Sequence, residues 1–559
     1  MQKYTKHYNT KRTSQKEAIP GREAEMAENY AGGVVFKLDE WKILDRVLIL
    51  GSDKPTYYAS AKTLTKECAK NLAGLIKQDA KRVVDRIVEV SDAGRAPNND
   101  PALFALAMVA GTADDEGKKY ALANLNKVAR IGTHLFHFVE YVQGFRGWGR
   151  GLRNGLANWY LDKATDKLAL QVVKYQGRDG WTHRDVLRKI HVKTNDETLN
   201  KIFAWVTHGI GGEVKSKDGT MRKTFPQSID SMKDIKLIYG FERAKLAENE
   251  DEVVKLISEY NLPREAVPTQ FMGKKVYGAL LPKMPMTALI RNLGNLSKVG
   301  ILKAGNFDEI KLVVDKITSE ENLRKARVHP LQLLMALKIY GAGHGMRGKG
   351  EWEVVPQIVD ALDEAFYKAF AFVEPTGKRI LIALDVSGSM TMNCVAGVEG
   401  LTPRAASAVM AMVTMKAEQN WAVVGFTSGR RDSYMERGAI STLNLSPRMR
   451  LDDVERTVDN LPFGGTDCAL PAIWAKEQKR DFDAIIILTD NESWAGDIAP
   501  TQALKQYENI IGHSVYQVVV AMTATQYSVA DPKEATQLDV VGFDSSAPAI
   551  ISDFISGKL

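Results

Sequence analysis

The first two thirds of the chain has the periodicity of amphipathic helices. Between residues 36 and 372, apolar residues recur three and four positions apart in segments such as LFALAMVAG (103–111), EVVKLISEY (252–260) and LQLLMALKIY (331–340). Apolar residues at this spacing share one face of a helix. Short stretches of Gly, Pro, Asn and Asp separate the segments. This pattern predicts antiparallel helix pairs stacked as a solenoid of degenerate repeats, although no fixed period is visible in the letters.

The pattern changes after PTGKR (375–379). Continuous apolar runs now alternate with helical stretches; the runs are RILIAL (379–384), WAVVGF (421–426), AIIILT (484–489) and VYQVVVAM (515–522). A short, fully apolar run is typical of a strand that is buried on both faces. Strands that alternate with helices predict a doubly wound α/β fold around a parallel sheet.

The chain therefore divides into three predicted parts. Residues 24–372 form an all-α helical-repeat domain and residues 373–559 form an α/β domain. Residues 1–23 are polar and basic, with few apolar side chains, and predict a flexible leader. This leader is either a solvated tail or a segment that touches nucleic acid.

Composition narrows the class of protein. A chain of 559 residues is too long for one ordinary core, and 45% hydrophobic with 26% charged residues excludes a disordered or fibrous chain. Cys68, Cys394 and Cys468 are far apart and lack CxxC spacing, which argues against a disulfide framework and indicates a reducing compartment. The N-terminus has no apolar signal region, and no apolar stretch of about 20 residues occurs. We expect a cytoplasmic protein that does not associate with a membrane.

Charge is distributed unevenly between the two large parts. Residues 1–380 hold 61 Lys and Arg against 46 Asp and Glu, whereas residues 381–559 hold 14 against 22. The formal charges are +15 and −8. The densest basic segment, residues 141–224, holds 16 basic and 8 acidic residues. Such asymmetry points to a polyanionic partner for the helical part.

Hydroxyl and carboxylate groups follow the predicted strands of the acidic part. Asp385, Ser387 and Ser389 lie directly after RILIAL, Thr466 precedes a helix, and Asp490 follows AIIILT. Ligands in an open α/β sheet bind beyond the carboxyl ends of the strands. This oxygen-only donor set suits Mg²⁺, with Mn²⁺ or Ca²⁺ as alternatives. The alternative interpretation is a chance turn and helix-cap sequence.

The basic segment contains two candidate anion-binding groups. Arg150 and Arg153 lie in GFRGWGRGLRNG (144–155), whose glycines do not fit a dinucleotide fingerprint because no strand precedes them. Lys174 and Arg178 are four residues apart, a spacing that would place them on one helix face. Arg188 and His191 continue a rhythm of three and four residues. Phosphates attract such charges, although a solvated helix face would have the same pattern.

The acidic part resembles a von Willebrand factor A domain, whose metal-ion-dependent adhesion site has the order DxSxS, Thr, Asp. The resemblance implies that Ser387, Ser389 and Thr466 bind the cation directly or nearly so, and that Asp385 and Asp490 act mostly through water. In that family a carboxylate of a partner often fills the open position. This implies a binding module with an acidic protein ligand.

From residue 24 the whole chain resembles the sixty-kilodalton Ro autoantigen family of bacterial or phage type, whose helical part is the TROVE module. The matching segments occur in the same order, and they include AGGVVF (31–36), GTHLFHF (132–138), WGRGLRNGLANWY (148–160), GWTHRDVLRKIHVK (180–193), GHGMRGK (343–349) and GGTDCALPAIWA (464–475). The resemblance implies a ring of HEAT-like repeats closed by the von Willebrand factor A domain. It also implies binding of small noncoding Y RNA outside the ring and of 3′ ends of misfolded or precursor RNA in its hole.

By this resemblance, Lys174, Arg178 and His191 match RNA-contacting positions. Arg188 is their neighbour by spacing, and Arg150 with Arg153 either binds RNA or holds the fold. Our first hypothesis is a non-catalytic scaffold for RNA quality control or maturation, to which Y-type RNA tethers an exoribonuclease in bacterial relatives. The alternatives are a metal-dependent protein-adhesion module, with the helical part as a platform, and a metal-dependent RNA-processing enzyme.

Overall fold

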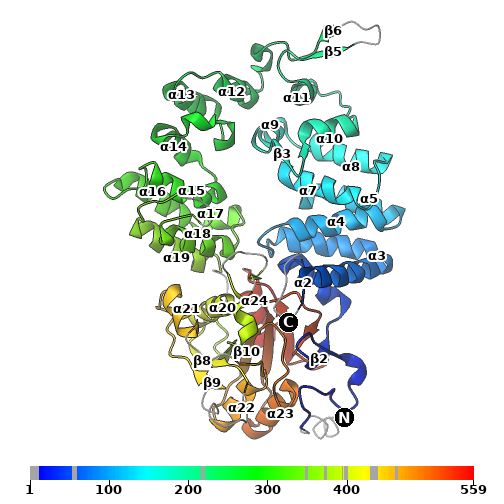
Figure 1. Ribbon diagram of the computed structural model, residues 1–559, viewed down its shortest axis with the longest axis vertical. Helices are drawn as coiled ribbons and strands as arrows, with labels where there is room; N and C mark the ends of the chain where they lie inside the picture. Colours follow the sequence, from blue (N-terminus) through cyan, green and yellow to red (C-terminus); the bar gives the residue numbers. More distant parts are fainter. Residues whose placement is uncertain are drawn as a thin grey trace.

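The chain folds into a helical part and an α/β part that lie end to end (Figure 1). The computed structural model describes residues 12–52, 59–215, 221–345, 350–370, 374–392, 394–395, 401–428, 439–459, 464–544 and 546–559. No helix in these ranges is long and apolar enough to cross a membrane.

The helical part consists of two runs of helices that stand side by side above the α/β part (Figure 1). The first run comprises α2 (Glu40–Leu50), α3 (Ala61–Asp92), α4 (Asp100–Thr112), α5 (Asp115–Ala123), α6 (Leu125–Val128), α7 (Gly132–Gln143), α8 (Arg150–Leu161), α9 (Thr165–Lys174), α10 (His183–Ile190) and α11 (Glu197–His208). The second run comprises α12 (Lys236–Lys245), α13 (Glu250–Tyr260), α14 (Lys274–Leu280), α15 (Met286–Lys298), α16 (Phe307–Ile317), α17 (Glu320–Lys325), α18 (Pro330–Ala342) and α19 (Pro356–Lys368). The prediction of a predominantly helical domain is confirmed.

Short polar residues explain where many of these helices begin. The side chain of Asp39 accepts hydrogen bonds from Trp41 N and Lys42 N at the start of α2. Thr182 and Asp185 form a reciprocal capping box at the start of α10. Such caps satisfy backbone N–H groups that have no partner inside the helix.

Short irregular elements connect the helices. The 3₁₀ turns are η1 (Glu23–Glu25), η2 (Ile229–Met232), η3 (Arg264–Ala266), η4 (Thr269–Phe271), η5 (Leu281–Lys283) and, in the α/β part, η6 (Gly388–Thr391). Two small antiparallel hairpins pair β3 (Gly177–Arg178) with β4 (Trp181–Thr182), and β5 (Glu213–Lys215) with β6 (Met221–Lys223). Because α9 ends at Lys174 and Arg178 lies in β3, the prediction that these two residues share a helix face is wrong.

The α/β part is built on a six-stranded sheet with the order β13-β11-β10-β7-β8-β9. Its strands are β7 (Arg379–Asp385), β8 (Asn420–Phe426), β9 (Ile440–Thr442), β10 (Ala484–Thr489), β11 (Tyr516–Ala521) and β13 (Gln537–Val541). All pairings are parallel except that of β8 with β9. Its helices are α20 (Pro403–Ala417), α21 (Leu451–Asp459), α22 (Leu470–Glu477), α23 (Pro500–Ile511) and α24 (Ala547–Ile555). The α/β prediction is confirmed, with one antiparallel edge strand added.

Residues 12–37, which we call the N-terminal segment, pack against the α/β part. Strands β1 (Met26–Glu28), β2 (Val34–Lys37) and β12 (Tyr527–Ser528) form a separate antiparallel sheet with β2 in the centre. Residues 12–23 differ from the predicted solvated leader because Gln15 and Ile19 are 2% exposed and Arg22 forms an ion pair with Asp531 at 2.7 Å. Residues 1–11 of that leader lie outside the described residues.

Contacts with the α/β part close the helical arc at both ends. Arg46 of α2 forms an ion pair with Asp539 at 2.6 Å, and Arg95 forms one with Asp544 at 3.3 Å. At the other end, the ring of Phe370, just after α19, meets that of Phe543 edge to face at 6.0 Å. The helical and α/β parts together therefore form a closed ring.

Candidate functional sites

Two neighbouring strand ends carry the predicted cation ligands. Strands β7 and β10 are adjacent and parallel, with Leu384 opposite Leu488, so Asp385 and Asp490 emerge at the same edge of the sheet. The glycine-rich loop 464–467 joins them there, because Gly388 N donates to Gly464 O at 3.3 Å. The tertiary structure thus brings together all five predicted ligands, which are at most 5% exposed: Asp385, Ser387, Ser389, Thr466 and Asp490.

Hydrogen bonds order the DxSxS loop. Ser387 N donates to Asp385 Oδ1 at 2.9 Å, and the hydroxyls of Ser387 and Ser389 lie 3.2 Å apart. Thr489 Oγ1 donates to Asp385 Oδ2 at 2.7 Å. The Ser389 side chain opposes the rise in the pKa of the Asp490 carboxyl, so the two groups are neighbours. These bonds orient hydroxyl and carboxylate oxygens toward one another before any ligand binds.

In the described part of the chain, the site contains two buried carboxyl groups without a positively charged partner, and one hydroxyl group without a hydrogen-bond partner. Burial and repulsion by Asp490 raise the pKa of Asp385, and burial raises the pKa of Asp490. The buried Thr466 Oγ1 has no hydrogen-bond partner among the described residues. Nowhere in those residues do three His, Cys, Asp or Glu side chains gather as metal ligands, so a cation here needs the hydroxyls. Such a set of hard oxygen donors fits Mg²⁺.

The N-terminal segment covers the loop that follows β10. Gln15 Nε2 donates to Asp467 Oδ1 at 2.6 Å, and Ser493 Oγ donates to Gln15 Oε1 at 2.7 Å. Ala31 N donates to Glu492 Oε2 at 3.1 Å. Burial raises the pKa of Asp467 to about 6, and burial together with Asp490 raises that of Glu492 to about 8. No local pattern in the sequence pairs residue 15 with residue 467, so the sequence alone does not predict these contacts.

A cavity of about 870 Å³ separates the two helical runs. On one side it is bordered by α7, the end of α9 and β3, and on the other by η3, α15 and the start of α18. Most of its charged lining residues are cationic: Arg130, Lys174, Arg178, Arg264, Arg291 and Arg327. Among the described lining residues, only Asp100 and Glu265 are acidic. Burial and repulsion by Arg327 lower the pKa of Arg130, which reflects this crowding of positive charge.

The predicted RNA-binding residues separate into two groups. Lys174 and Arg178 line the cavity. The other four are exposed, lie on α8 or at α10, and do not line it: Arg150, Arg153, Arg188 and His191. Figure 1 shows α9 and β3 beside the gap between the runs and α8 farther out.

Aromatic rings lie beside the second group. Trp148 and Trp181 are 5.7 Å apart between ring centroids, and Lys189 Nζ lies 5.8 Å from the Trp148 ring. Arg188 Nη2 donates to Thr207 O at 3.3 Å. His191 ends α10 in the left-handed conformation. Both tryptophans are half-buried. Cations next to aromatic rings that are partly accessible are suited to phosphates and unpaired bases.

Comparison with known proteins identifies both parts of the chain. Residues 27–341 match the TROVE domain and residues 379–555 match the Ro60 vWA domain. An RNA-binding protein RO60 from Deinococcus radiodurans is 40% identical over 95% of each chain. The chain belongs to the Ro60 family.

Other Ro60 proteins support this assignment. An RNA-binding protein RO60 from Caenorhabditis elegans is 34% identical over 95% of this chain and 90% of its own length. The crystal structure of the Deinococcus radiodurans RO (RSR) protein matches with a TM-score of 0.68 and 39% identity, covering 93% of this Ro60-family chain and all of the other. The family and fold predicted from the sequence are confirmed, whereas the cation and the individual RNA contacts stay predictions.

Proposed function

We propose that this Ro60-family protein is a non-catalytic RNA-binding scaffold. Single-stranded 3′ ends of misfolded or precursor RNA bind in the cationic cavity, and small structured Y-type RNA binds the exposed surface around α8 and α10. The observation that carries the proposal is the cavity lined by Arg130, Lys174, Arg178, Arg264, Arg291 and Arg327. So much positive charge around one hollow favours a polyanion.

The proposed role is RNA quality control or maturation in the cytoplasm, with an exoribonuclease recruited through the bound RNA. The two groups of cations support two separate binding surfaces, one for an unpaired end and one for a structured RNA. Asp467 and Glu492, which follow Thr466 and Asp490 in the sequence, accept hydrogen bonds from the N-terminal segment, and this favours a structural over a catalytic role. Purified protein with Mg²⁺ should therefore leave RNA intact; turnover that Asp385→Ala abolishes would establish the enzyme hypothesis instead.

Binding measurements with two RNAs test the scaffold. Lys174→Ala with Arg178→Ala should weaken binding of a single-stranded oligouridine at least tenfold, and Arg153→Ala with Arg188→Ala should weaken binding of a small stem-loop RNA. For wild-type protein, log affinity should fall with log salt by about 0.7 per phosphate neutralised on the single strand.

The matched control removes two exposed lysines elsewhere, Lys119 on α5 and Lys255 on α13. This variant has the same net charge as the cavity variant and should retain affinity for both RNAs. If the control and cavity variants lose RNA affinity equally, binding depends only on the overall charge of the protein, and the cavity is not the RNA-binding site.

We further propose that Ser387, Ser389 and Thr466, supported by Asp385 and Asp490, hold a divalent cation, most simply Mg²⁺. Two observations support this cation site: the buried Thr466 Oγ1 has no hydrogen-bond partner among the described residues, and the buried carboxyl groups of Asp385 and Asp490 repel each other. When bound, the cation would neutralise these carboxylates and offer an open position to a carboxylate of an acidic protein partner.

Thermal unfolding of the full chain tests the cation. Saturating Mg²⁺ or Mn²⁺ should raise the midpoint by several degrees, because a ligand that binds only the folded state stabilises it. Thr466→Val, which removes one hydroxyl and keeps the shape, should reduce that rise, and Asp385→Ala should abolish it. A rise of the same size in all three proteins would place the cation elsewhere.

A further inference from the structure

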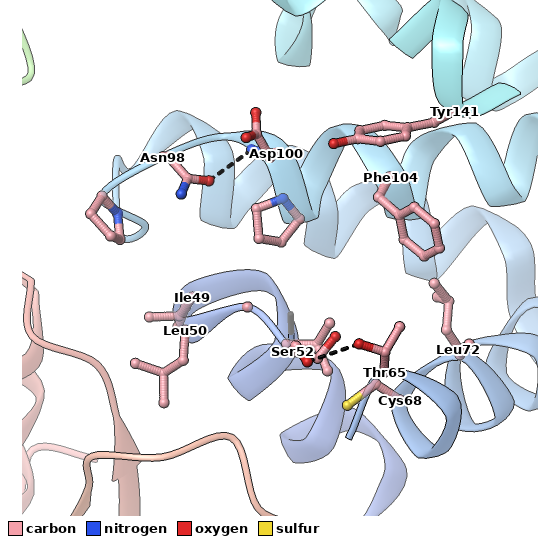
Figure 2. Close-up of a pocket in the computed structure, with 15 residues that line it drawn as sticks. Ile49, Leu50, Ser52, Thr65, Cys68, Leu72, Asn98, Asp100, Phe104 and Tyr141 are labelled. Atoms are coloured by element: carbon pink, nitrogen blue, oxygen red, sulfur yellow. Dashed lines mark hydrogen bonds between the residues drawn. The ribbon is translucent and has the colours of Figure 1, made fainter. Parts of the chain in front are cut away.

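A second cavity opens from the loop that borders the central one. It has a volume of about 460 Å³ and lies between α2, α3, α4 and the end of α7 (Figure 2). Pro97, Asn98 and Asp100 line both cavities. An RNA strand in the cationic cavity would therefore pass the entrance of this pocket.

Apolar and aromatic side chains form the body of the pocket. Phe104 of α4 and Tyr141 of α7 meet edge to face, with ring centroids 5.6 Å apart. Figure 2 shows these two rings on one side of the pocket and Leu50 and Cys68 on the floor. Leu72 is 2% exposed and Cys68 4%, so the floor is part of the hydrophobic core. Such a lining suits a flat, mainly apolar group with a polar edge.

The rim carries complementary hydrogen-bonding groups. Asp100 N donates to Asn98 Oδ1 at 3.0 Å, which leaves the Asn98 Nδ2 amine to serve as a donor. The side chain of Asp100 is 46% exposed, and its ionised carboxylate can only accept. Figure 2 places both residues above the pocket, where the loop enters α4.

A chain of contacts connects this rim to the predicted RNA-binding residues. His137 Nε2 lies 3.8 Å from Asp100 Oδ1, and its ring stacks on Tyr141 with centroids 6.3 Å apart and an angle of 17°. On its other side His137 Nδ1 contacts Asp179, which lies 3.6 Å from Arg178 Nε. A nucleotide whose phosphate contacts Arg178 or a neighbouring cation would thus have its base near Tyr141.

We propose that this pocket binds one unpaired guanine base of the RNA in the central cavity. The inference rests on the proposed function and adds base selectivity to it. Guanine presents two adjacent donors, N1–H and the N2 amine, to the Asp100 carboxylate, and its O6 is next to them for Asn98 Nδ2. Adenine and cytosine each offer a single amine, and uracil a single N–H beside O4, so none of them gives the Asp100 carboxylate two hydrogen bonds while also accepting one from Asn98. The base stacks against Phe104 or Tyr141, as single-stranded RNA does on aromatic side chains.

Fluorescence anisotropy with the full-length protein tests the pocket. The probes are an oligouridine of twelve residues and the same strand with one guanosine, inosine or adenosine near its 3′ end. Inosine keeps N1–H and O6 but lacks the N2 amine. The guanosine strand should bind about tenfold more tightly than the inosine and adenosine strands, since one hydrogen bond to a charged group is lost.

Two variants locate the effect. Asp100→Asn should remove the preference for guanosine without weakening oligouridine binding, because it takes only a negative charge away from the edge of the cationic cavity. Phe104→Leu should reduce the preference. Asp115→Asn is the matched control, because Asp115 also lies in the first turn of a helix, α5, but does not line the pocket. This control should keep the full preference.

The outcomes separate this inference from the scaffold on which it rests. If wild-type protein binds all four strands equally, or if Asp100→Asn keeps the preference, the guanine pocket is wrong while the scaffold stands. If oligouridine itself does not bind, the scaffold fails. A preference for guanosine that Asp100→Asn and Phe104→Leu both reduce supports the pocket.

Discussion

At the residue scale, buried polar side chains join distant parts of the chain, and His329 is an example. His329 is 4% exposed and caps α18, where its Nδ1 accepts from Leu331 N at 3.1 Å. Its Nε2 faces Arg95 O at 3.3 Å. Because Nδ1 accepts, Nε2 carries the proton and the ring is neutral. A second proton on Nδ1 would break the cap.

This arrangement predicts a stability that depends on pH. Burial lowers the pKa of His329 to about 4, so the unfolded chain binds this proton more readily than the folded one. The contribution of His329 to folding is therefore full above its unfolded pKa of about 6.5 and is lost as pH falls toward 4. Between pH 7.5 and 4.5 the wild type should lose about 2 kcal/mol more free energy of unfolding than His329→Asn, which keeps a capping side chain.

Urea denaturation at several pH values measures this difference. Half-buried His134 and buried His183, whose pKa values are lowered to about 4 and about 3, are present in both proteins, so their contributions cancel in the comparison. If the free energy of unfolding changes with pH in the same way in wild type and His329→Asn, the lowered pKa of His329 does not contribute to stability and the prediction is wrong.

At the scale of elements, the N-terminal segment acts as a part of the α/β domain. Gln15 N donates to Gly496 O at 3.0 Å, and Asn29 Nδ2 donates to Ser493 O at 3.0 Å. A Cβ added to Gly33 would lie 1.9 Å from Ser493 O, so only glycine allows this approach. The segment thereby holds the loop that follows Asp490, one of the proposed cation ligands.

Removal of one side chain from this segment should destabilise the α/β part. Gln15→Ala leaves the buried Asp467 and Ser493 without hydrogen bonds that they now make, and it should lower the free energy of unfolding by about 2 kcal/mol. Urea denaturation gives the value. Gln78→Ala, at an exposed position on α3, is the control and should change it by less than about 0.5 kcal/mol. If Gln15→Ala changes the free energy of unfolding as little as Gln78→Ala does, the hydrogen bonds of Gln15 do not stabilise the α/β part.

At the scale of the whole molecule, the buried side chain of Arg46 is one of the contacts that join the helical part to the α/β part. Arg46 is 1% exposed, and its Nη1 donates to Thr525 O at 2.6 Å and to Tyr527 O at 2.8 Å. Its Nη2 pairs with Asp539. This one guanidinium therefore connects α2 with the loop before β12, with β12 itself and with β13.

Loss of this charge should loosen the closure of the ring. Arg46→Met keeps the apolar stem but leaves Asp539 as an unpaired buried charge, which should cost about 3–5 kcal/mol. Arg86→Met is the matched control, since Arg86 pairs with Asp45 inside the helical ring and is 28% exposed. It should cost about 1 kcal/mol. If Arg46→Met alone shows separate unfolding transitions for the helical and α/β parts, the role of Arg46 in closing the ring is confirmed. If both variants lose the same free energy of unfolding, that role is contradicted.

Much of the architecture follows from local patterns. Helical spacing between residues 36 and 372, and apolar runs after 379, define both fold classes, because each reflects which faces of an element are buried. The grouping of Asp385 with Asp490 was also predictable. Both follow strands of one parallel sheet, whose carboxyl ends lie at one edge.

Only the tertiary structure decided which distant surfaces meet. Lys174 and Arg178 lie on a helix end and a hairpin rather than on one helix face, yet the curve of the ring places both at the cavity wall. Asp100 and Phe104 gave no functional signal in the sequence, since one begins a helix and the other lies among apolar residues. Gln15 reaches Asp467 across 452 residues. Periodicity is a short-range property, whereas these contacts depend on how complete elements pack against each other, and no spacing in the sequence encodes that.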